Sequence, residues 1–274
     1  MPLFALLEHN PILLIATVGF FSLLIGSFLN AAIYRLPVML QREWDAECHE
    51  HLNADNPNYV AKETERFNLF VPRSACPKCD HSISSLENIP VLSYLMLDGK
   101  CKGCRTKISI QYPIIEIMTA LLSMFIAWKF GYSWQMLGML VFAWTLITLG
   151  MIDVNTMLLP DNLTLPLMWL GLIVNYFGTF VDLHSAVVGA MFGYLSLWGV
   201  YQLFKLATGK EGMGYGDFKI LAAIGAWGGW QIIPFTIFAS ACLGAVIGII
   251  VLKMKNQANS QPIPYGPWLA LAGL

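Results

Sequence analysis

The chain alternates between long apolar segments and shorter polar connections, and most of the apolar segments are about as long as a membrane is thick. A helix needs about 20 apolar residues to cross a hydrocarbon core of about 30 Å. Charged residues make up only 12% of the chain, whereas a soluble domain normally carries about 25%. The sequence therefore predicts an all-α polytopic membrane protein with about eight transmembrane helical segments. These segments fall at about 11–33, 113–131, 134–152, 163–181, 185–206, 218–229, 230–252 and 263–274.

Two of these segments are too short to cross a bilayer as straight helices. Residues 218–229 are rich in Gly and Ala, so we expect a short or broken helix beside a cavity. Residues 263–274 would form only about 18 Å of helix, and we expect this span to be cut short or to end inside the bilayer. The first segment follows ten residues without Lys or Arg, which predicts a permanent helix and not a cleaved signal peptide.

One long polar stretch, residues 34–112, separates the first two apolar segments and contains ten of the sixteen Lys and Arg residues. Basic residues favour the cytoplasmic side of a membrane, so we expect this stretch in the cytoplasm and the N-terminus outside. We predict three parts: a first transmembrane helix at 1–33, a cytoplasmic loop domain at 34–112 and a membrane-embedded helical domain at 113–274. Threading the later segments from this start brings Asp153 and Asp217 to the same, cytoplasmic face.

Two similar cysteine patterns occur in the polar stretch. The pairs Cys76-Pro-Lys-Cys79 and Cys101-Lys-Gly-Cys104 are separated by 21 residues, and each opens a related eight-residue stretch. Such turns direct two thiolates at one ion, and two of them complete a tetrahedral zinc site. Disulfides or free thiols are the alternatives, but a cytoplasmic location disfavours disulfides. The spacing predicts one structural zinc per chain in a small zinc ribbon, with no open position for catalysis.

Asp217 stands in the sequence Gly214-Tyr-Gly-Asp217, between strongly apolar segments. A carboxylate at the membrane boundary is costly and is by default a hypothesis for a functional site. Gly214 and Gly216 would let a substrate backbone approach closely. A simpler interpretation is that Asp217 caps the helix that begins at Phe218. The two interpretations are compatible with each other.

Asp153 ends an apolar segment 64 residues before Asp217. Two acids that share a proton can activate water, as in aspartic proteases, so the pair favours a membrane-embedded aspartic peptidase. Alone, Asp153 could simply be a boundary residue that reaches solvent. Asp161 follows a proline before the next segment, and we interpret it as a helix cap. Glu116 lies about one turn inside the second segment and is a candidate for lining a polar cavity, with its role open.

Several motifs, in this order, resemble the type IV prepilin leader peptidases, which are bifunctional inner-membrane enzymes of bacteria. The resemblance covers essentially the whole chain. The motifs are Gly26-Ser-Phe-Leu-Asn30 with Tyr34-Arg-Leu-Pro37, the two cysteine pairs, Tyr112-Pro113 through Glu116, Ile152-Asp153, Leu159-Pro-Asp161, Gly214-Tyr-Gly-Asp-Phe-Lys219 and Tyr265-Gly266-Pro267.

The resemblance implies an activity and its site. Members cleave the short basic leader of prepilins and of the pseudopilins of type II secretion on the cytoplasmic side. They then N-methylate the new N-terminal residue with S-adenosylmethionine as the methyl donor. The family's catalytic aspartates match Asp153 and Asp217, and the four cysteines match its zinc-bearing members. The protein is thus expected in the bacterial inner membrane with a periplasmic N-terminus, with prepilins as partners and no nucleic acid.

Three other functions stay open at this point. One is a preflagellin or presenilin type of peptidase, which has the same aspartate chemistry but no methyltransferase activity. Another is a proton-coupled membrane transporter in which intramembrane acids relay protons. The third is a zinc-ribbon scaffold with inert acids. The glycines around Asp217 and the cysteine pairs are unexplained by a transporter, so these features favour the peptidase.

Overall fold

A computed structural model describes residues 3–53, 66–84, 86–255 and 264–274 of the chain. Residues 54–65 of the predicted loop domain and the first residue of the last predicted segment lie outside this range. The described part consists of helices and irregular segments, with two isolated β-bridges and no β-strand. The helices are α1 (Leu3–His9), α2 (Pro11–Leu52), η1 (Leu86–Asn88), α3 (Leu92–Met96), α4 (Gln111–Phe130), α5 (Trp134–Thr156), α6 (Asp161–Tyr176), α7 (Leu183–Thr208), α8 (Tyr215–Gly228), η2 (Trp230–Ile232), α9 (Ile233–Lys255) and α10 (Gly266–Gly273).

The prediction of an all-α membrane protein is confirmed. Each of the eight predicted apolar segments contains a helix, and five helical segments are long and apolar enough to cross a bilayer. The helices α6, α8 and α10 have 16, 14 and 8 residues, which correspond to about 24, 21 and 12 Å. The count of eight complete spans therefore stays a prediction. The five long segments are Pro11–Leu52, Gln111–Phe130, Trp134–Thr156, Leu183–Thr208 and Trp230–Ile250.

The first long helix extends well beyond the predicted boundary at residue 33. Helix α2 has 42 residues and continues through Pro37 to Leu52, a length of about 63 Å. Hydropathy marks where a helix leaves the hydrocarbon, but good helix formers such as Leu, Gln, Glu and Arg can continue it in water. The first part of the predicted loop, from residue 34 to Leu52, is therefore helical.

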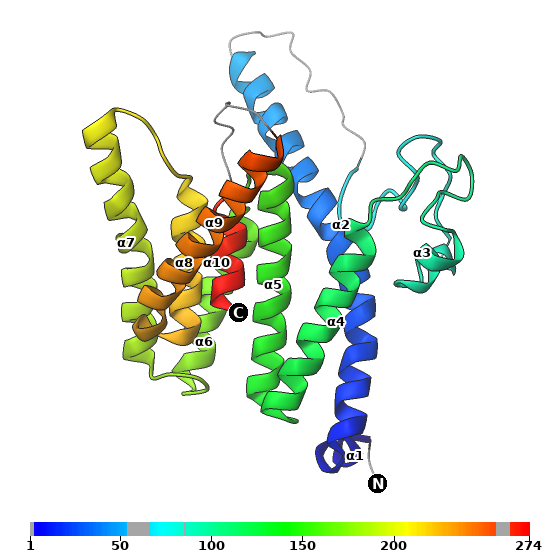
Figure 1. Ribbon diagram of the computed structural model, residues 1–274, viewed down its shortest axis with the longest axis horizontal. Helices are drawn as coiled ribbons and strands as arrows, with labels where there is room; N and C mark the ends of the chain where they lie inside the picture. Colours follow the sequence, from blue (N-terminus) through cyan, green and yellow to red (C-terminus); the bar gives the residue numbers. More distant parts are fainter. Residues whose placement is uncertain (1–2, 54–65, 85, 256–263) are drawn as a thin grey trace. The chain divides into compact units, whose positions relative to one another are not determined.

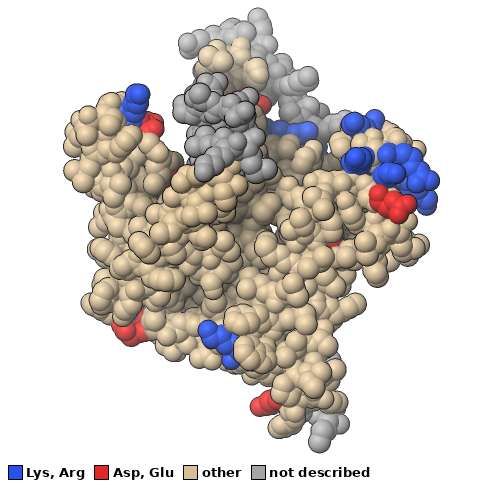
Figure 2. All heavy atoms as spheres, in the orientation of Figure 1, with Lys and Arg blue, Asp and Glu red and all other residues tan. Residues whose placement is uncertain are grey.

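The chain forms two compact units, residues 1–131 and 132–274. In the first unit α4 packs antiparallel along α2, and a Cβ on Gly26 would lie only 2.8 Å from Cα of Glu116. Helix α4 thus groups with α2, whereas the sequence boundary at 112/113 placed it with the later helices. Figure 2 shows Lys and Arg gathered over the cysteine-bearing segment of this unit. Exposed basic residues in or beside the two cysteine turns include Lys78, Lys100, Lys102, Arg105 and Lys107.

The second unit is organised around the short helix α8, which contacts α6, α7, α9 and α10 (Figure 1). Ten of its 14 residues are buried. Helix α7 approaches it closely, since a Cβ on Gly193 would lie 2.5 Å from the carbonyl oxygen of Leu221. The prediction of a short helix for this segment is confirmed. It is apolar because protein surrounds it on most sides.

Two buried side chains of the second unit fix the far end of α8. The Nδ2 group of Asn175 donates to the carbonyl oxygens of Ala226 and Trp227 over 2.8 and 2.9 Å. The indole N–H of Trp227 donates to the carbonyl of Leu167 over 2.8 Å. Carbonyl groups in the last turn of a helix lack hydrogen-bond donors within that helix, and the side chain of Asn175 supplies donors to two of them. This anchoring holds α8 so that its first turn lies at a defined position.

Candidate active site and metal centre

Asp153 lies in the last turn of α5, inside the helix, because α5 continues to Thr156. Its side chain is only 5% exposed. Oδ2 accepts a hydrogen bond from the backbone N–H of Gly266, at the start of α10, over 3.0 Å. The simpler interpretation of Asp153 as a residue that reaches solvent is therefore wrong. The hydrogen bond to its carboxylate comes from Gly266, which is 113 residues away in the sequence.

Asp217 is the third residue of α8, and the N-cap of that helix is Gly214. The interpretation of Asp217 as the cap is wrong, since the structure gives the helix no side-chain cap. Asp217 is 6% exposed, and its Oδ1 atom has no hydrogen-bond partner in the part of the chain that the structure describes. A buried unpaired carboxylate oxygen is unusual and calls for a water molecule or a substrate group as its partner.

The two acids lie in the same unit and share neighbours. Asp217 is within electrostatic range of Asp153. A Cβ on Gly216 would lie 2.5 Å from Cβ of Leu159, and a Cβ on Gly266 would lie 3.2 Å from Cδ1 of the same leucine. The side chain of Leu159 therefore packs against two backbone segments. One carries Asp217, and the other donates a hydrogen bond to Asp153.

The two glycines before Asp217 have different surroundings. A Cβ on Gly214 would meet only Oδ2 of Asp217, at 3.8 Å, so there is open space beside the carboxylate. Gly216, by contrast, packs tightly on Leu159. The structure thus gives Gly216 a packing reason to be glycine and shows open space at Gly214, whereas a close substrate approach at either glycine stays a prediction.

Asp161 does not cap a helix, as the sequence interpretation had it. Pro160 occupies the cap position of α6, and no side chain caps that end. Oδ1 and Oδ2 of Asp161 instead accept hydrogen bonds from Nζ of Lys219 over 2.6 and 2.7 Å. The sequence interpretation relied on the Pro-Asp dipeptide, which is common before helices. It could not identify Lys219 as the partner, because that residue lies 58 positions away in the sequence.

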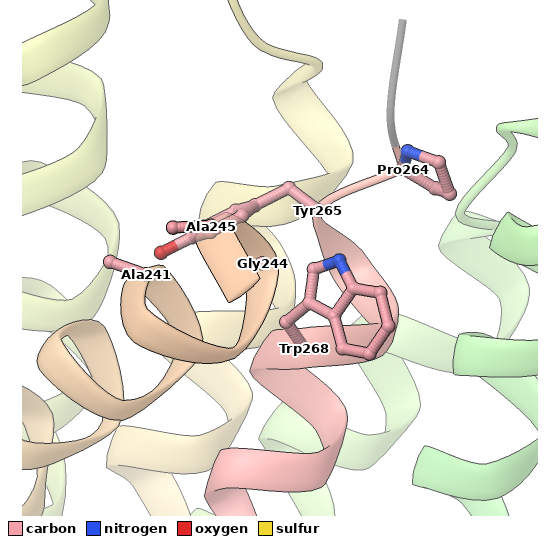
Figure 3. A pocket seen from close by; sticks show the side chains of 6 residues that line it. All are labelled: Ala241, Gly244, Ala245, Pro264, Tyr265 and Trp268. Carbon is pink, nitrogen blue, oxygen red and sulfur yellow. The ribbon is translucent and has the colours of Figure 1, made fainter. Parts of the chain in front are cut away.

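A pocket of about 240 Å³ lies between α9 and the segment that leads into α10 (Figure 3). Tyr265 and Trp268 line one side of it, and its lining also includes Ala241, Gly244, Ala245 and Pro264. The hydroxyl group of Tyr265 is 2.7 Å from Oγ of Ser240. The next residue is Gly266, so the pocket adjoins the segment whose N–H holds Asp153.

Glu116 belongs to the first unit and has a defined partner there. Its side chain is 7% exposed, and Oε2 accepts a hydrogen bond from the backbone N–H of Val91 over 2.7 Å. Val91 has a φ of 61°, which is unusual for a β-branched residue. Glu116 therefore ties α4 to the segment before α3, and its role in a polar cavity stays a prediction.

The four cysteines Cys76, Cys79, Cys101 and Cys104 come together in the first unit. Their Sγ atoms all lie within 4.8 Å of one another, an arrangement that could hold a metal ion. Sγ of Cys76 is 3.8 Å from Sγ of Cys104, and Sγ of Cys79 is 3.9 Å from Sγ of Cys101. These distances exceed the roughly 2 Å of a disulfide bond. Cys48 and Cys242 are exposed and lie outside this cluster.

The two cysteine turns have the same backbone structure, as their related sequences predict. Cys76 N–H donates to His81 O over 3.0 Å, and Cys101 N–H donates to Thr106 O over 2.8 Å. A β-bridge flanks each turn at the same positions, Ala75 with Ser82 and Lys100 with Lys107. The fifth residue of each turn, Asp80 or Arg105, has a positive φ. The sequence repeat is thus a structural repeat that presents two pairs of thiols.

His81 faces a carboxylate and not the sulfur cluster. Its Nε2 atom is 3.2 Å from Oε2 of Glu87, and Nζ of Lys102 is 3.1 Å from Oε1 of the same glutamate. The backbone N–H of Ser84, together with Lys102 and His81, lowers the pKa of Glu87 to about 2. The ionised glutamate therefore links the first cysteine turn to the second, next to the candidate metal centre.

Two residues of structural importance were missed by sequence reasoning. Gly266 was noted only within a motif at the start of the last segment, and no sequence pattern shows that its N–H binds Asp153. Arg35 was treated only as part of a motif and of the basic polar stretch. It is instead 7% exposed and donates to the carbonyls of Asn68 and Pro72 over 2.8 and 2.6 Å. Both interactions use backbone groups, which carry no signature in the sequence.

Two family models match the chain, and their limits follow its compact units. Residues 20–130 match the bacterial peptidase A24 N-terminal domain, and residues 140–249 match the type IV leader peptidase family. The first match contains the four cysteines, and the second contains Asp153 and Asp217. The class defined by the fold and the site is therefore a membrane-embedded peptidase of this kind.

Full-length relatives agree with the family models. A prepilin leader peptidase/N-methyltransferase of Pseudomonas aeruginosa is 51% identical over 100% of this chain and 93% of its own length. Proteins of the same name from Aeromonas salmonicida and Neisseria gonorrhoeae are 52% and 49% identical, over 100% and 92% of this chain and 94% and 86% of their own lengths. No solved structure matches the chain. The chain belongs to the type IV leader peptidase family.

Proposed function

We propose that this protein cleaves the basic leader of type IV prepilins and pseudopilins and then N-methylates the new N-terminal residue. The methyl group would come from S-adenosylmethionine, a second substrate. The observation that carries the proposal is the pair of buried acids, Asp153 and Asp217, in a chain that relatives of the family match over its whole length. Relatives about 50% identical are named for both activities.

The mechanism follows from two carboxyl groups that share one proton. The ionised member accepts a proton from a water molecule, whose oxygen attacks the scissile carbonyl carbon. The protonated member donates a hydrogen bond to the carbonyl oxygen, which becomes negative as the tetrahedral intermediate forms. Collapse of the intermediate breaks the C–N bond, and a proton passes from the carboxyl pair to the leaving amine. The proton belongs to the pair rather than to one residue.

The surroundings of the acids support this mechanism. The unpaired Oδ1 atom of Asp217 can accept a hydrogen bond from a water molecule. The Gly266 N–H holds one oxygen of Asp153 and leaves the other free to act. The open space beside Gly214 would admit an extended peptide next to Asp217.

We propose that the cysteine cluster binds one structural zinc ion. Zinc binds thiolate sulfur at about 2.3 Å, so the sulfur atoms of a tetrahedral site are about 3.8 Å apart. The sulfur pairs at 3.8 and 3.9 Å agree with this value. Four sulfur ligands leave no position for a reacting group. The ion would therefore hold the two turns together and take no part in catalysis.

The proposed topology places the acids and the substrate junction on the cytoplasmic side. A prepilin joins a basic leader to an apolar helix, and moving the leader's charges through lipid would be costly. The leader then stays in the cytoplasm while the apolar helix lies in the membrane. Single-cysteine variants at positions 155 and 212 test this arrangement. Both should react with a membrane-impermeant thiol reagent only from the cytoplasmic side, and reaction from the periplasm would contradict the topology.

The alternative functions explain less of the chain. Peptidases of the preflagellin or presenilin type account for the acids but not for the match of the N-terminal domain or for the cysteine cluster. A proton-coupled transporter explains neither the cluster nor relatives that are named as peptidases.

The proposal is tested by incubating the purified full-length protein with a prepilin and S-adenosylmethionine. Mass spectrometry of the pilin should show loss of the leader and a gain of one methyl group. A pilin of unchanged mass would contradict both activities, and cleavage without methylation would favour the first alternative.

A further inference from the structure

A short connection joins α5 to α6, and its backbone is held at both ends. Met157 ends α5 in the left-handed conformation, with a φ of 54°, and its N–H donates to the carbonyl of Asp153 over 2.9 Å. Pro160 begins the next helix, and its carbonyl accepts a hydrogen bond from the N–H of Leu163 over 3.1 Å. Leu159 is therefore presented by a turn that starts within four residues of Asp153.

The side chain of Leu159 fills the space between two glycine backbones. On the α8 side, a Cβ on Gly216 would lie 2.5 Å from Cβ and 2.9 Å from Cδ1 of the leucine. On the α10 side, a Cβ on Gly266 would lie 3.2 Å from the same Cδ1. A side chain at position 216 would have to displace Leu159 or α8, and one at position 266 would press on Leu159 and displace the carboxylate of Asp153.

Each of these glycines is directly connected to one of the two acids. Gly216 precedes Asp217 in the chain, and the N–H of Gly266 donates a hydrogen bond to Asp153. A single apolar side chain thus contacts the backbone that carries one carboxylate and the backbone that holds the other. A change in the volume of this side chain would therefore alter the packing against both backbones.

A second contact links the connection to α8. Asp161, two residues after Leu159, binds Nζ of Lys219 over 2.6 and 2.7 Å. Gly216 and Lys219 are three residues apart on α8, so the two contacts lie along one face of that helix. The connection and the first turn of α8 are therefore in contact at two points.

We propose that Leu159 is a positioning residue that sets the distance between the carboxylates of Asp153 and Asp217. The inference rests on the proposed function, since it concerns the geometry of the peptidase reaction. The side chain of Leu159 is a hydrocarbon and cannot itself transfer a proton. Its effect is exerted through Gly216 and Gly266, and a misplacement of about 1 Å in such a site lowers the rate about a hundredfold.

The test uses the purified full-length protein and measures kcat and KM for prepilin cleavage. Leu159→Ala should lower kcat about tenfold to a hundredfold and change KM by less than about threefold, because binding surfaces for the substrate are unchanged. Leu159→Met keeps the volume and should retain kcat within about threefold. Leu158→Ala, a leucine beside it in the same connection, is the matched control and should behave as the wild type.

Thermal unfolding of each variant shows whether a loss of rate is a loss of folded protein. Equal losses of kcat in the alanine and methionine variants, or a wild-type kcat in folded Leu159→Ala, would overturn the inference. A fall in the folded fraction that accounts for the whole rate loss would also overturn it. These outcomes differ from a failure of the proposed function, in which the wild-type protein cleaves no prepilin.

A paired substitution gives an independent measurement. Gly216→Ala alone should lower kcat strongly, because its new methyl group would collide with Cβ of Leu159. In Gly216→Ala/Leu159→Gly that atom is absent, so the double variant should be more active than the product of the two single effects predicts. Independent, multiplicative effects would show that the two residues are not coupled and would contradict the inference.

Discussion

The backbone N–H of Gly266 donates a hydrogen bond to Oδ2 of Asp153 over 3.0 Å, although the two residues are 113 positions apart in the sequence. The first residue of α10 thereby holds an acid at the end of α5. The relationship makes the last described helix part of the candidate active site. It also explains why position 266 is glycine, since a Cβ there would lie 2.7 Å from that oxygen atom.

Gly266→Ala should therefore impair cleavage without unfolding the protein. The added methyl group would push the Asp153 carboxylate away from its donor, and we expect kcat to fall about a hundredfold. Gly199→Ala is the matched control, because a Cβ at Gly199 meets nothing within 4 Å. Steady-state rates of leader cleavage measure both. A Gly266→Ala protein with wild-type kcat would show that this hydrogen bond is dispensable.

Asn175→Ala should destabilise the second unit. Besides its bonds to Ala226 and Trp227, Asn175 accepts hydrogen bonds from the N–H groups of Phe180 and Val181 over 3.1 and 3.2 Å. Its removal takes the donor away from the carbonyls of Ala226 and Trp227 and the acceptor away from the partly buried N–H of Val181. We therefore expect a loss of about 2–4 kcal/mol in the free energy of unfolding. Thermal unfolding in detergent measures the effect.

The control for this prediction is the exposed Asn162, which lies on α6 like Asn175. Asn162→Ala should change the stability by less than about 0.5 kcal/mol. Equal melting temperatures for the two alanine variants would show that the network around Asn175 does not stabilise the fold.

Replacing the four clustered cysteines by serine should remove about one metal ion per chain. Elemental analysis of the full-length protein measures this loss, and the Cys48→Ser/Cys242→Ser double variant should keep its metal. Because a small ribbon has too little apolar core to fold unaided, limited proteolysis should then cut the region around residues 66–110 faster. Unchanged metal content in the fourfold variant would refute the site.

Asp161→Asn should retain substantial activity. The ion pair of Asp161 with Lys219 is partly exposed, with side-chain exposures of 53% and 27%, and such pairs contribute less than about 1 kcal/mol. An amide still accepts one hydrogen bond from the lysine, so α8 should keep its position. Cleavage assays should give a rate within about fivefold of the wild type. A complete loss of cleavage would mean that Asp161 belongs to the chemistry.

Local signals in the sequence predicted the helical segments and the clustering of the four cysteines correctly. Apolar runs mark the helices because lipid tolerates only backbone that is hydrogen-bonded within the segment. The cysteine turns are recognisable because each pair of ligands comes from one short stretch. Both features depend on residues close together in the chain, so their spacing is visible without a structure.

Contacts between distant segments could not be predicted in the same way. The bond from Gly266 to Asp153, the Lys219 partner of Asp161 and the packing of Leu159 all join residues of different helices. The end of α2 was also missed, because hydropathy reports the limits of the membrane and not those of the helix. The candidate acids were named from the sequence, whereas the groups that hold them were found only in the structure.

The most direct test of the account measures the masses of the pilin products from three purified proteins. The wild type, Asp153→Asn and Asp217→Asn are each incubated with a prepilin and S-adenosylmethionine, after metal content and melting temperature have shown that all three are folded. The account predicts a leaderless, singly methylated pilin from the wild type and intact prepilin from both variants. Leader cleavage at the wild-type rate by either variant would contradict the proposal that Asp153 and Asp217 together activate water.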